Sequence, residues 1–84
     1  MKIKPNIALS ESGFVFNPGT GESFSLNPIG MEILELIREG KDYNAIRDKI
    51  AKHYEIEDTL FEKDFEDFKY LLKNYQIIET DEQA

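Results

Sequence analysis

The stretch "FSLNPIGMEILELI", residues 24–37, joins an alternating segment directly to a helical one. Its first three residues are apolar, polar and apolar, which is the period of a half-buried strand. Asn27 is a favourable N-cap, and Pro28 falls at the first helical position, where its missing N–H costs nothing. The stretch therefore predicts a strand that passes into a helix with almost no loop.

The residues upstream predict a small antiparallel meander. "FVF" (14–16) has the β-branched and aromatic content of a strand, "NPGTG" (17–21) is a strong turn signal, and "ESFSLN" (22–27) alternates. "KIKPNIAL" (2–9) suits an edge strand at best, because Pro5 interrupts it. Such a meander is marginal alone and must pack on something else.

Three amphipathic helices are predicted downstream and supply that partner. The first ends at Gly40, a left-handed C-terminal residue, and Asp42 caps the second. Thr59 and Glu62 form a capping box for the third, which is followed by a short extended segment over residues 76–79. The predicted apolar stripes consist of Ile29, Ile33, Leu34, Leu36 and Ile37 in the first helix, of Tyr43, Ile46, Ile50 and Tyr54 in the second, and of Leu60, Phe61, Phe65, Phe68, Leu71, Leu72 and Tyr75 in the third.

This order predicts an α+β fold with an N-terminal three-stranded antiparallel sheet followed by a three-helix bundle. The length of 84 residues fits a single domain over residues 1–84, with residues 80–84 as a disordered tail.

Charge and composition narrow the classes of partner. Seventeen acids against ten bases give a net charge of −7, which disfavours nucleic acid and anionic membranes. A protein or peptide partner fits this acidity, and so does simple solubility. The chain has no cysteine, no secretory signal and no run of about 20 apolar residues. We therefore expect a cytoplasmic protein that does not contact a membrane.

The sequence offers no catalytic constellation. His53 is the only histidine, and a lone histidine near a helix end usually favours the helix dipole or lies at the surface. Seven acids crowd residues 55–67 against Lys63, but they lack the spacing of a calcium loop and indicate a solvated helix face. "GTG" (19–21) has no following Lys-Ser/Thr and indicates a turn, not a phosphate loop. We expect a protein that is not an enzyme and that holds no cofactor and no metal.

Three motifs carry a resemblance to a known family over about residues 5–79. They are "SLNPIGMEILELIREGK" (25–41), "NAIRDKIAKHYEI" (44–56) and "FEKDFEDFKYLLKNYQII" (61–78). In this ordered set the chain resembles the PqqD-like proteins, peptide chaperones also called RiPP recognition elements. It departs from the family at Gln76, where glycine is frequent, and at Lys69, where leucine is frequent.

The resemblance implies a winged-helix-like fold that binds the leader segment of a ribosomally made precursor peptide. The leader is held between the third strand and the third helix and is presented to a modifying enzyme, often a radical SAM protein. The residues agree in outline, because an exposed strand edge can accept an extended peptide as a further strand. The expected binding residues are Glu22, Ser23, Phe24, Ser25 and Leu26 on the strand, and Phe65, Phe68, Lys69 and Leu72 on the third helix.

Some roles and two other functions stay open. Phe65 and Phe68 fit the core as well as a groove wall, whereas we expect Lys69 to be accessible and to pair with an acidic leader residue. A DNA-binding winged helix is disfavoured, because Glu62–Asn74 carries four acids and three lysines and the hairpin signals precede all the helices. A general protein–protein adaptor would use the same edge and groove. The chain is expected to be a monomer or a weak homodimer.

Overall fold

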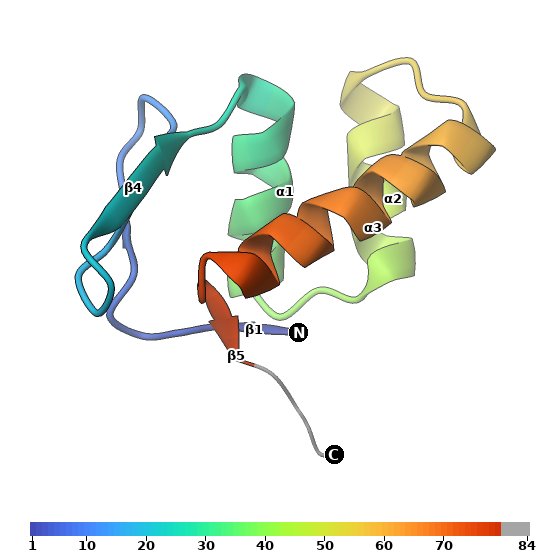
Figure 1. Ribbon diagram of the computed structural model, residues 1–84. Helices are drawn as coiled ribbons and strands as arrows, with labels where there is room; N and C mark the ends of the chain where they lie inside the picture. Colours follow the sequence, from blue (N-terminus) through green and yellow to red (C-terminus); the bar gives the residue numbers. More distant parts are fainter. Residues whose placement is uncertain (80–84) are drawn as a thin grey trace.

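The computed structural model describes residues 1–79 and has an α+β architecture (Figure 1). The tail predicted over residues 80–84 lies outside the described residues. The elements in chain order are β1 (Lys2–Ile3), β2 (Ala8–Leu9), β3 (Phe14–Asn17), β4 (Glu22–Ser25), α1 (Pro28–Arg38), α2 (Tyr43–His53), α3 (Asp58–Asn74) and β5 (Ile78–Glu79).

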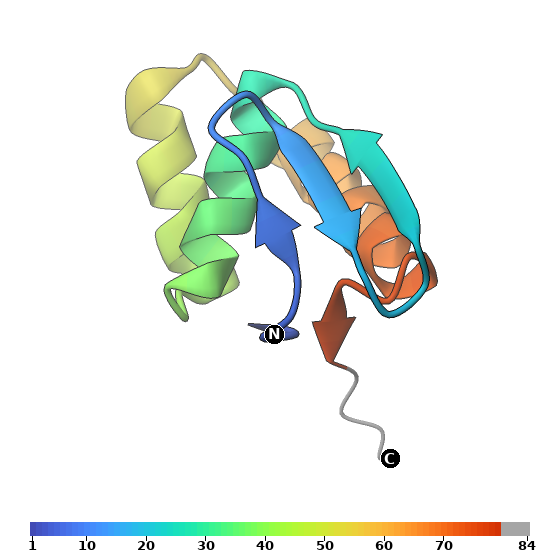
Figure 2. The same cartoon turned by 90° about the vertical axis from the view of Figure 1, so that its left-hand side faces the viewer.

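The N-terminal strands form the predicted three-stranded antiparallel sheet in the order β2-β3-β4. Figure 2 shows β3 and β4 side by side, with α3 behind them. Within residues 1–79 no strand pairs with the far side of β4, which leaves β4 as an edge. The segment before the sheet is divided by the turn at Pro5, and its first part, β1, pairs with β5 instead. This two-stranded ladder was not predicted.

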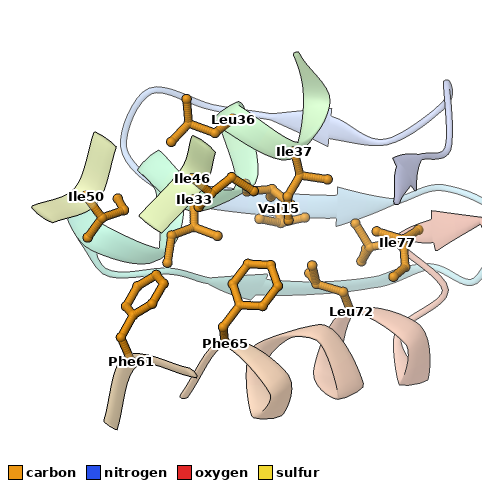
Figure 3. Close-up of a cluster of buried hydrophobic side chains, with 12 residues drawn as sticks. Val15, Ile33, Leu36, Ile37, Ile46, Ile50, Phe61, Phe65, Leu72 and Ile77 are labelled. Carbon is orange, nitrogen blue, oxygen red and sulfur yellow. The ribbon is translucent and has the colours of Figure 1, made fainter. Parts of the chain in front are cut away.

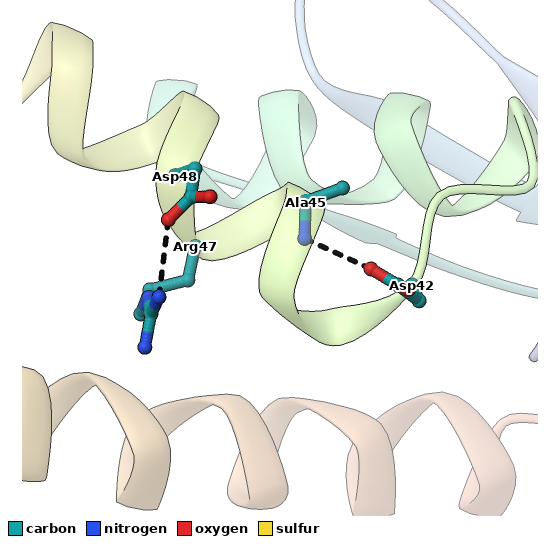
Figure 4. A network of polar contacts seen from close by, with 4 residues as sticks. All are labelled: Asp42, Ala45, Arg47 and Asp48. Atoms are coloured by element: carbon teal, nitrogen blue, oxygen red, sulfur yellow. Dashed lines mark hydrogen bonds and ion pairs between the residues drawn. The ribbon is translucent and has the colours of Figure 1, made fainter.

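The predicted start and end of the first helix and the predicted start of the second helix are confirmed. Asn27 Oδ1 accepts a hydrogen bond from the Gly30 N–H at 2.8 Å, and Pro28 is the first residue of α1. Gly40 follows α1 with φ +88°, a left-handed conformation that glycine adopts without strain. Asp42 Oδ1 accepts from the Ala45 N–H at 2.9 Å and caps α2 (Figure 4).

The third helix begins earlier than predicted, so the capping box at Thr59 is wrong. Glu57 is the N-cap, and its carboxylate accepts from the Leu60 N–H at 2.8 Å. Thr59 therefore lies inside the first turn. Leu60 is 61% exposed and does not belong to the buried stripe, because it lies about 100° around the helix from Phe61.

The core lies where the sheet meets the helices (Figure 3). Val15 of β3 packs there with the apolar faces of all three helices and with the segment after α3. None of the helices within residues 1–79 is long and apolar enough to cross a membrane. The buried apolar residues are Val15, Ile33, Leu34, Leu36, Ile37, Ile46, Ile50, Phe61, Phe65, Leu72, Ile77 and Ile78.

Candidate functional site

The free edge of β4 exposes the backbone of two serines. The Leu26 N–H donates to the Gly13 carbonyl at 2.7 Å, in register with the neighbouring pair Phe14–Ser25. Backbone groups along an antiparallel strand alternate in direction, so those of Ser23 and Ser25 point away from β3. The Phe14 carbonyl confirms this alternation, because it accepts from the Ser10 N–H at 2.9 Å on the β2 side. The edge therefore offers two N–H donors and two carbonyl acceptors to a partner.

A groove of about 380 Å³ borders this edge and is bounded on its other side by α3. Its walls combine the end of β4, the first turns of α1 and one face of α3. The lining is mostly apolar, with Asp64 as its one charged side chain. The lining residues are Ser25, Leu26, Asn27, Ile29, Gly30, Ile33, Phe61, Asp64, Phe65 and Phe68.

The floor of the groove depends on a glycine in the first turn of α1. A Cβ at Gly30 would lie 3.1 Å from Asn27 Oδ1 and 3.4 Å from Leu26 Cβ. A larger residue would therefore press on the N-cap and on a residue that lines the groove. Glycine lets β4 pass into α1 with only Leu26 and Asn27 between them.

A buried asparagine fastens the β3–β4 hairpin to the end of α3. Asn17 is 3% exposed, and its Nδ2 donates to the carbonyls of Tyr75 at 3.0 Å and Gln76 at 3.1 Å. Its Oδ1 accepts from the Gly19 N–H at 2.9 Å. The rings of Phe24 and Tyr75 lie 4.8 Å apart and pack the same two elements together. These contacts fix β4 relative to α3, and hence the width of the groove.

The residue that departs from the family pattern, Gln76, adopts the conformation that glycine favours. Its φ is +58°, its N–H donates to the Lys73 carbonyl at 3.0 Å, and the next N–H, of Ile77, donates to the Leu72 carbonyl at 2.8 Å. This is a Schellman motif, in which the left-handed position is usually glycine. The expected geometry of the tail is thus retained with a less favourable residue.

The predicted strand residues point in different directions and contribute to the site in different ways. Ser23 and Ser25 present their backbones at the edge, and Leu26 lines the groove. Phe24 is half-buried against Tyr75, so it supports the edge from within. Glu22 is exposed at the hairpin end of β4, outside the groove lining.

The predicted α3 residues need two corrections. Phe65 and Phe68 line the groove, and Phe65 also belongs to the core. Leu72 is 0% exposed and points into the core (Figure 3), so its side chain forms no groove wall. Lys69 is not a lining residue either: it lies about 100° past Phe68, and its Nζ is 3.5 Å from Glu66 Oε1.

Lys69 lies on the side of α3 that faces α2, as the surroundings of Tyr43 indicate. Tyr43 of α2 packs against Phe61 and Phe65, and burial raises the pKa of its phenol. The negative charge of Glu62 is the next cause of that raised pKa, and Glu66 also contributes. The acids at 62 and 66, and with them Lys69, thus face away from β4.

Asp64 is the charged groove residue that the sequence interpretation missed, because it was counted among acids on a solvated face. Five further lining residues were not predicted for the site either: Ile29, Ile33 and Phe61 were assigned to the core stripes and Asn27 to a helix cap, and Gly30 was given no role. Asp64 lies three residues after Phe61 and four before Phe68, which is the spacing of one helix face. The spacing can be read from the sequence, but it identifies a groove residue only when the face of α3 that meets β4 is known.

The other polar candidate, His53, contacts an acidic side chain of α1. His53 Nδ1 lies 2.5 Å from Glu32 Oε2 and links the surfaces of α2 and α1. In the part of the chain that the structure describes, no three His, Cys, Asp or Glu side chains are grouped to hold a metal ion.

Comparisons with known proteins identify a family and a similar fold. The family model described as coenzyme PQQ synthesis protein D (PqqD) matches residues 13–78. The solved structure of TbiB1 in complex with the TbiA(β) leader peptide is similar, with a TM-score of 0.85 and 29% sequence identity over 99% of this chain and 100% of that chain. No curated protein matches the sequence. The extent of the family match shows that this chain belongs to the PqqD family.

Proposed function

We propose that this protein is a non-catalytic RiPP recognition element. It binds the leader segment of a ribosomally synthesised precursor peptide by adding it as a strand to β4, and presents it to a modifying enzyme of the radical SAM class. The observation that carries the proposal is the outward-facing backbone of Ser23 and Ser25 directly beside an apolar groove. Family membership and the leader-bound TbiB1 structure support it.

In strand addition, the β4 edge and the apolar groove contribute to binding in different ways. The two serines form backbone hydrogen bonds with any extended peptide, and each bond contributes about 0.5–1.5 kcal/mol net. Successive side chains of the added strand point to opposite faces, so every second one enters the groove. Generic affinity thus comes from the edge, and selectivity comes from the apolar lining that includes Leu26 and Phe68.

The edge is held in place before the peptide arrives. Asn17 ties the hairpin to α3, and Asn27 starts α1 immediately after the strand. Because neither element must be ordered on binding, less conformational entropy is lost. The chain acts as a monomer or a weak homodimer, since the same edge can pair with its own copy.

Titration of the ¹⁵N-labelled protein tests the proposal. The ligand is a synthetic peptide covering the N-terminal half of a candidate precursor, chosen from the short reading frames near this gene, and a scrambled version is the control. We expect the largest amide shifts at Ser23, Ser25 and Leu26 and on the groove face of α3 around Phe68. No shift, or shifts confined to α2, would contradict peptide binding at this site.

Presentation to an enzyme needs a second assay. A candidate radical SAM enzyme is incubated with its precursor peptide, with and without this protein, and the modified product is quantified by mass spectrometry. We expect modification only when this protein is present. Equal modification in its absence would show that the enzyme does not need this protein, and would favour a peptide-binding adaptor.

A further inference from the structure

The groove beside β4 continues along the start of α3. A second hollow of about 270 Å³ shares Ile29, Phe61 and Asp64 with the first. It extends to Ile56 and Leu60, at the connection before α3. The two hollows therefore adjoin at these shared residues, and we refer to them together as the channel, whose second part contains no β4 residue.

The floor of this extension is apolar and accessible. Ile29 and Ile56 are half-buried, and Leu60 is 61% exposed at its border. An apolar side chain from a bound segment would cover them and remove that surface from water. The exposure of Leu60, which the predicted core stripe did not explain, fits this role.

Every ionisable side chain that lines the channel is acidic. They are Glu55, Glu57 and Asp64, and no lysine, arginine or histidine lines either hollow. The Glu57 carboxylate already accepts the Leu60 N–H as a cap. Asp64 has no ion pair or side-chain hydrogen bond within residues 1–79, because the adjacent Lys63 reaches Asp67 at 3.4 Å instead.

We propose that the segment in this channel is cationic and amphipathic, with an apolar side chain on the floor and a lysine or arginine beside Asp64. This inference rests on the proposed function and names the class of leader that the site selects. An acidic peptide residue in the channel would be repelled by the lining carboxylates, because no lining residue carries a positive charge. Lys69 does not change this balance, because it lies on the α2 side of α3 beside Glu66.

A display experiment tests the inference without a known precursor. Random 16-residue peptides linked to their own mRNA are selected on the wild-type protein, on Asp64→Lys and on Glu62→Lys. Glu62→Lys is the matched control, because it makes the same change in net charge on the α2 side of α3. Both acids are exposed, so both variants should fold, which thermal melts followed by circular dichroism check.

We expect the wild-type protein and Glu62→Lys to enrich peptides with lysine or arginine at a fixed spacing from an apolar residue. Asp64→Lys should lose that enrichment and favour glutamate or aspartate at the same spacing. For one selected peptide, Asp64→Asn should raise Kd by about two- to five-fold, as expected for an accessible ion pair. The increase should disappear when the peptide's basic residue is replaced by glutamine.

The outcomes separate this inference from the proposed function. Selected peptides that shift the Ser23 and Ser25 amides but show no basic preference, or one that Asp64→Lys leaves unchanged, would overturn the cationic segment and leave peptide binding intact. Selection of no peptide, or of peptides that bind away from β4 and the groove, would overturn both.

Discussion

The Ser25 N–H provides a sharp test of strand addition. It points away from β3, so Ser25→Pro removes a donor that the fold does not use. Proline is tolerated on edge strands, and the preceding residue, Phe24, already lies in the extended conformation that proline requires. The folded state should therefore be largely preserved.

The free energy of peptide binding should change much more than the stability of the folded protein. The substitution removes one hydrogen bond of about 0.5–1.5 kcal/mol and leaves a peptide carbonyl unpaired at the edge. With the carbonyl left unpaired, the loss in binding free energy rises to about 1–3 kcal/mol, which corresponds to an increase in Kd of about five- to 150-fold. Fluorescence anisotropy of a labelled leader peptide measures this increase.

Two control variants complete the test. Ser25→Thr keeps the N–H and should bind like the wild-type protein. Phe24→Pro removes an N–H that points toward β3, so it should destabilise the protein itself, which urea denaturation would show. A folded Ser25→Pro protein with unchanged Kd would refute strand addition through this group.

Three further substitutions test the frame around the site by urea denaturation. Leu34→Ala should lower the free energy of unfolding by about 2–5 kcal/mol, because Leu34 is 0% exposed; a loss below 1 kcal/mol would contradict tight core packing at this position. Gln76→Gly should raise the free energy of unfolding by about 0.5–1 kcal/mol, because it relieves the left-handed φ; destabilisation would show that the glutamine side chain has a role of its own. Asn17→Ala should cost about 1–3 kcal/mol and also weaken leader binding in anisotropy, because two carbonyls at the end of α3 lose their donor; normal binding would show that the hairpin does not need this clamp.

Much of the fold could be predicted because short-range interactions determine it. The caps at Asn27 and Asp42, the left-handed Gly40 and the strands on either side of the turn at residues 17–21 each depend on neighbours within a few residues. The start of α3 was missed for a local reason too. The Glu57 carboxylate reaches the Leu60 N–H although glutamate is not a preferred N-cap.

The site was predicted less completely, because a difference of one residue on a helix changes its direction by about 100°. Leu72 and Lys69 share the α3 pattern with Phe65 and Phe68, yet one is in the core and the other faces α2. The opposite error was made with Asp64, which lines the groove.

The sequence by itself determined the three-stranded meander, the three helices that follow it, the acidic character and the serines in the strand before the first helix. Tertiary structure decided which backbone groups of Ser23 and Ser25 are free, because this depends on the register with β3. It also decided the pairing of β1 with β5, since two-residue strands from opposite ends of the chain carry no periodic signal. The groove is a tertiary feature for the same reason: its walls come from β4, α1 and α3, and only long-range packing, with Asn17 bonded to the end of α3, sets the space between them.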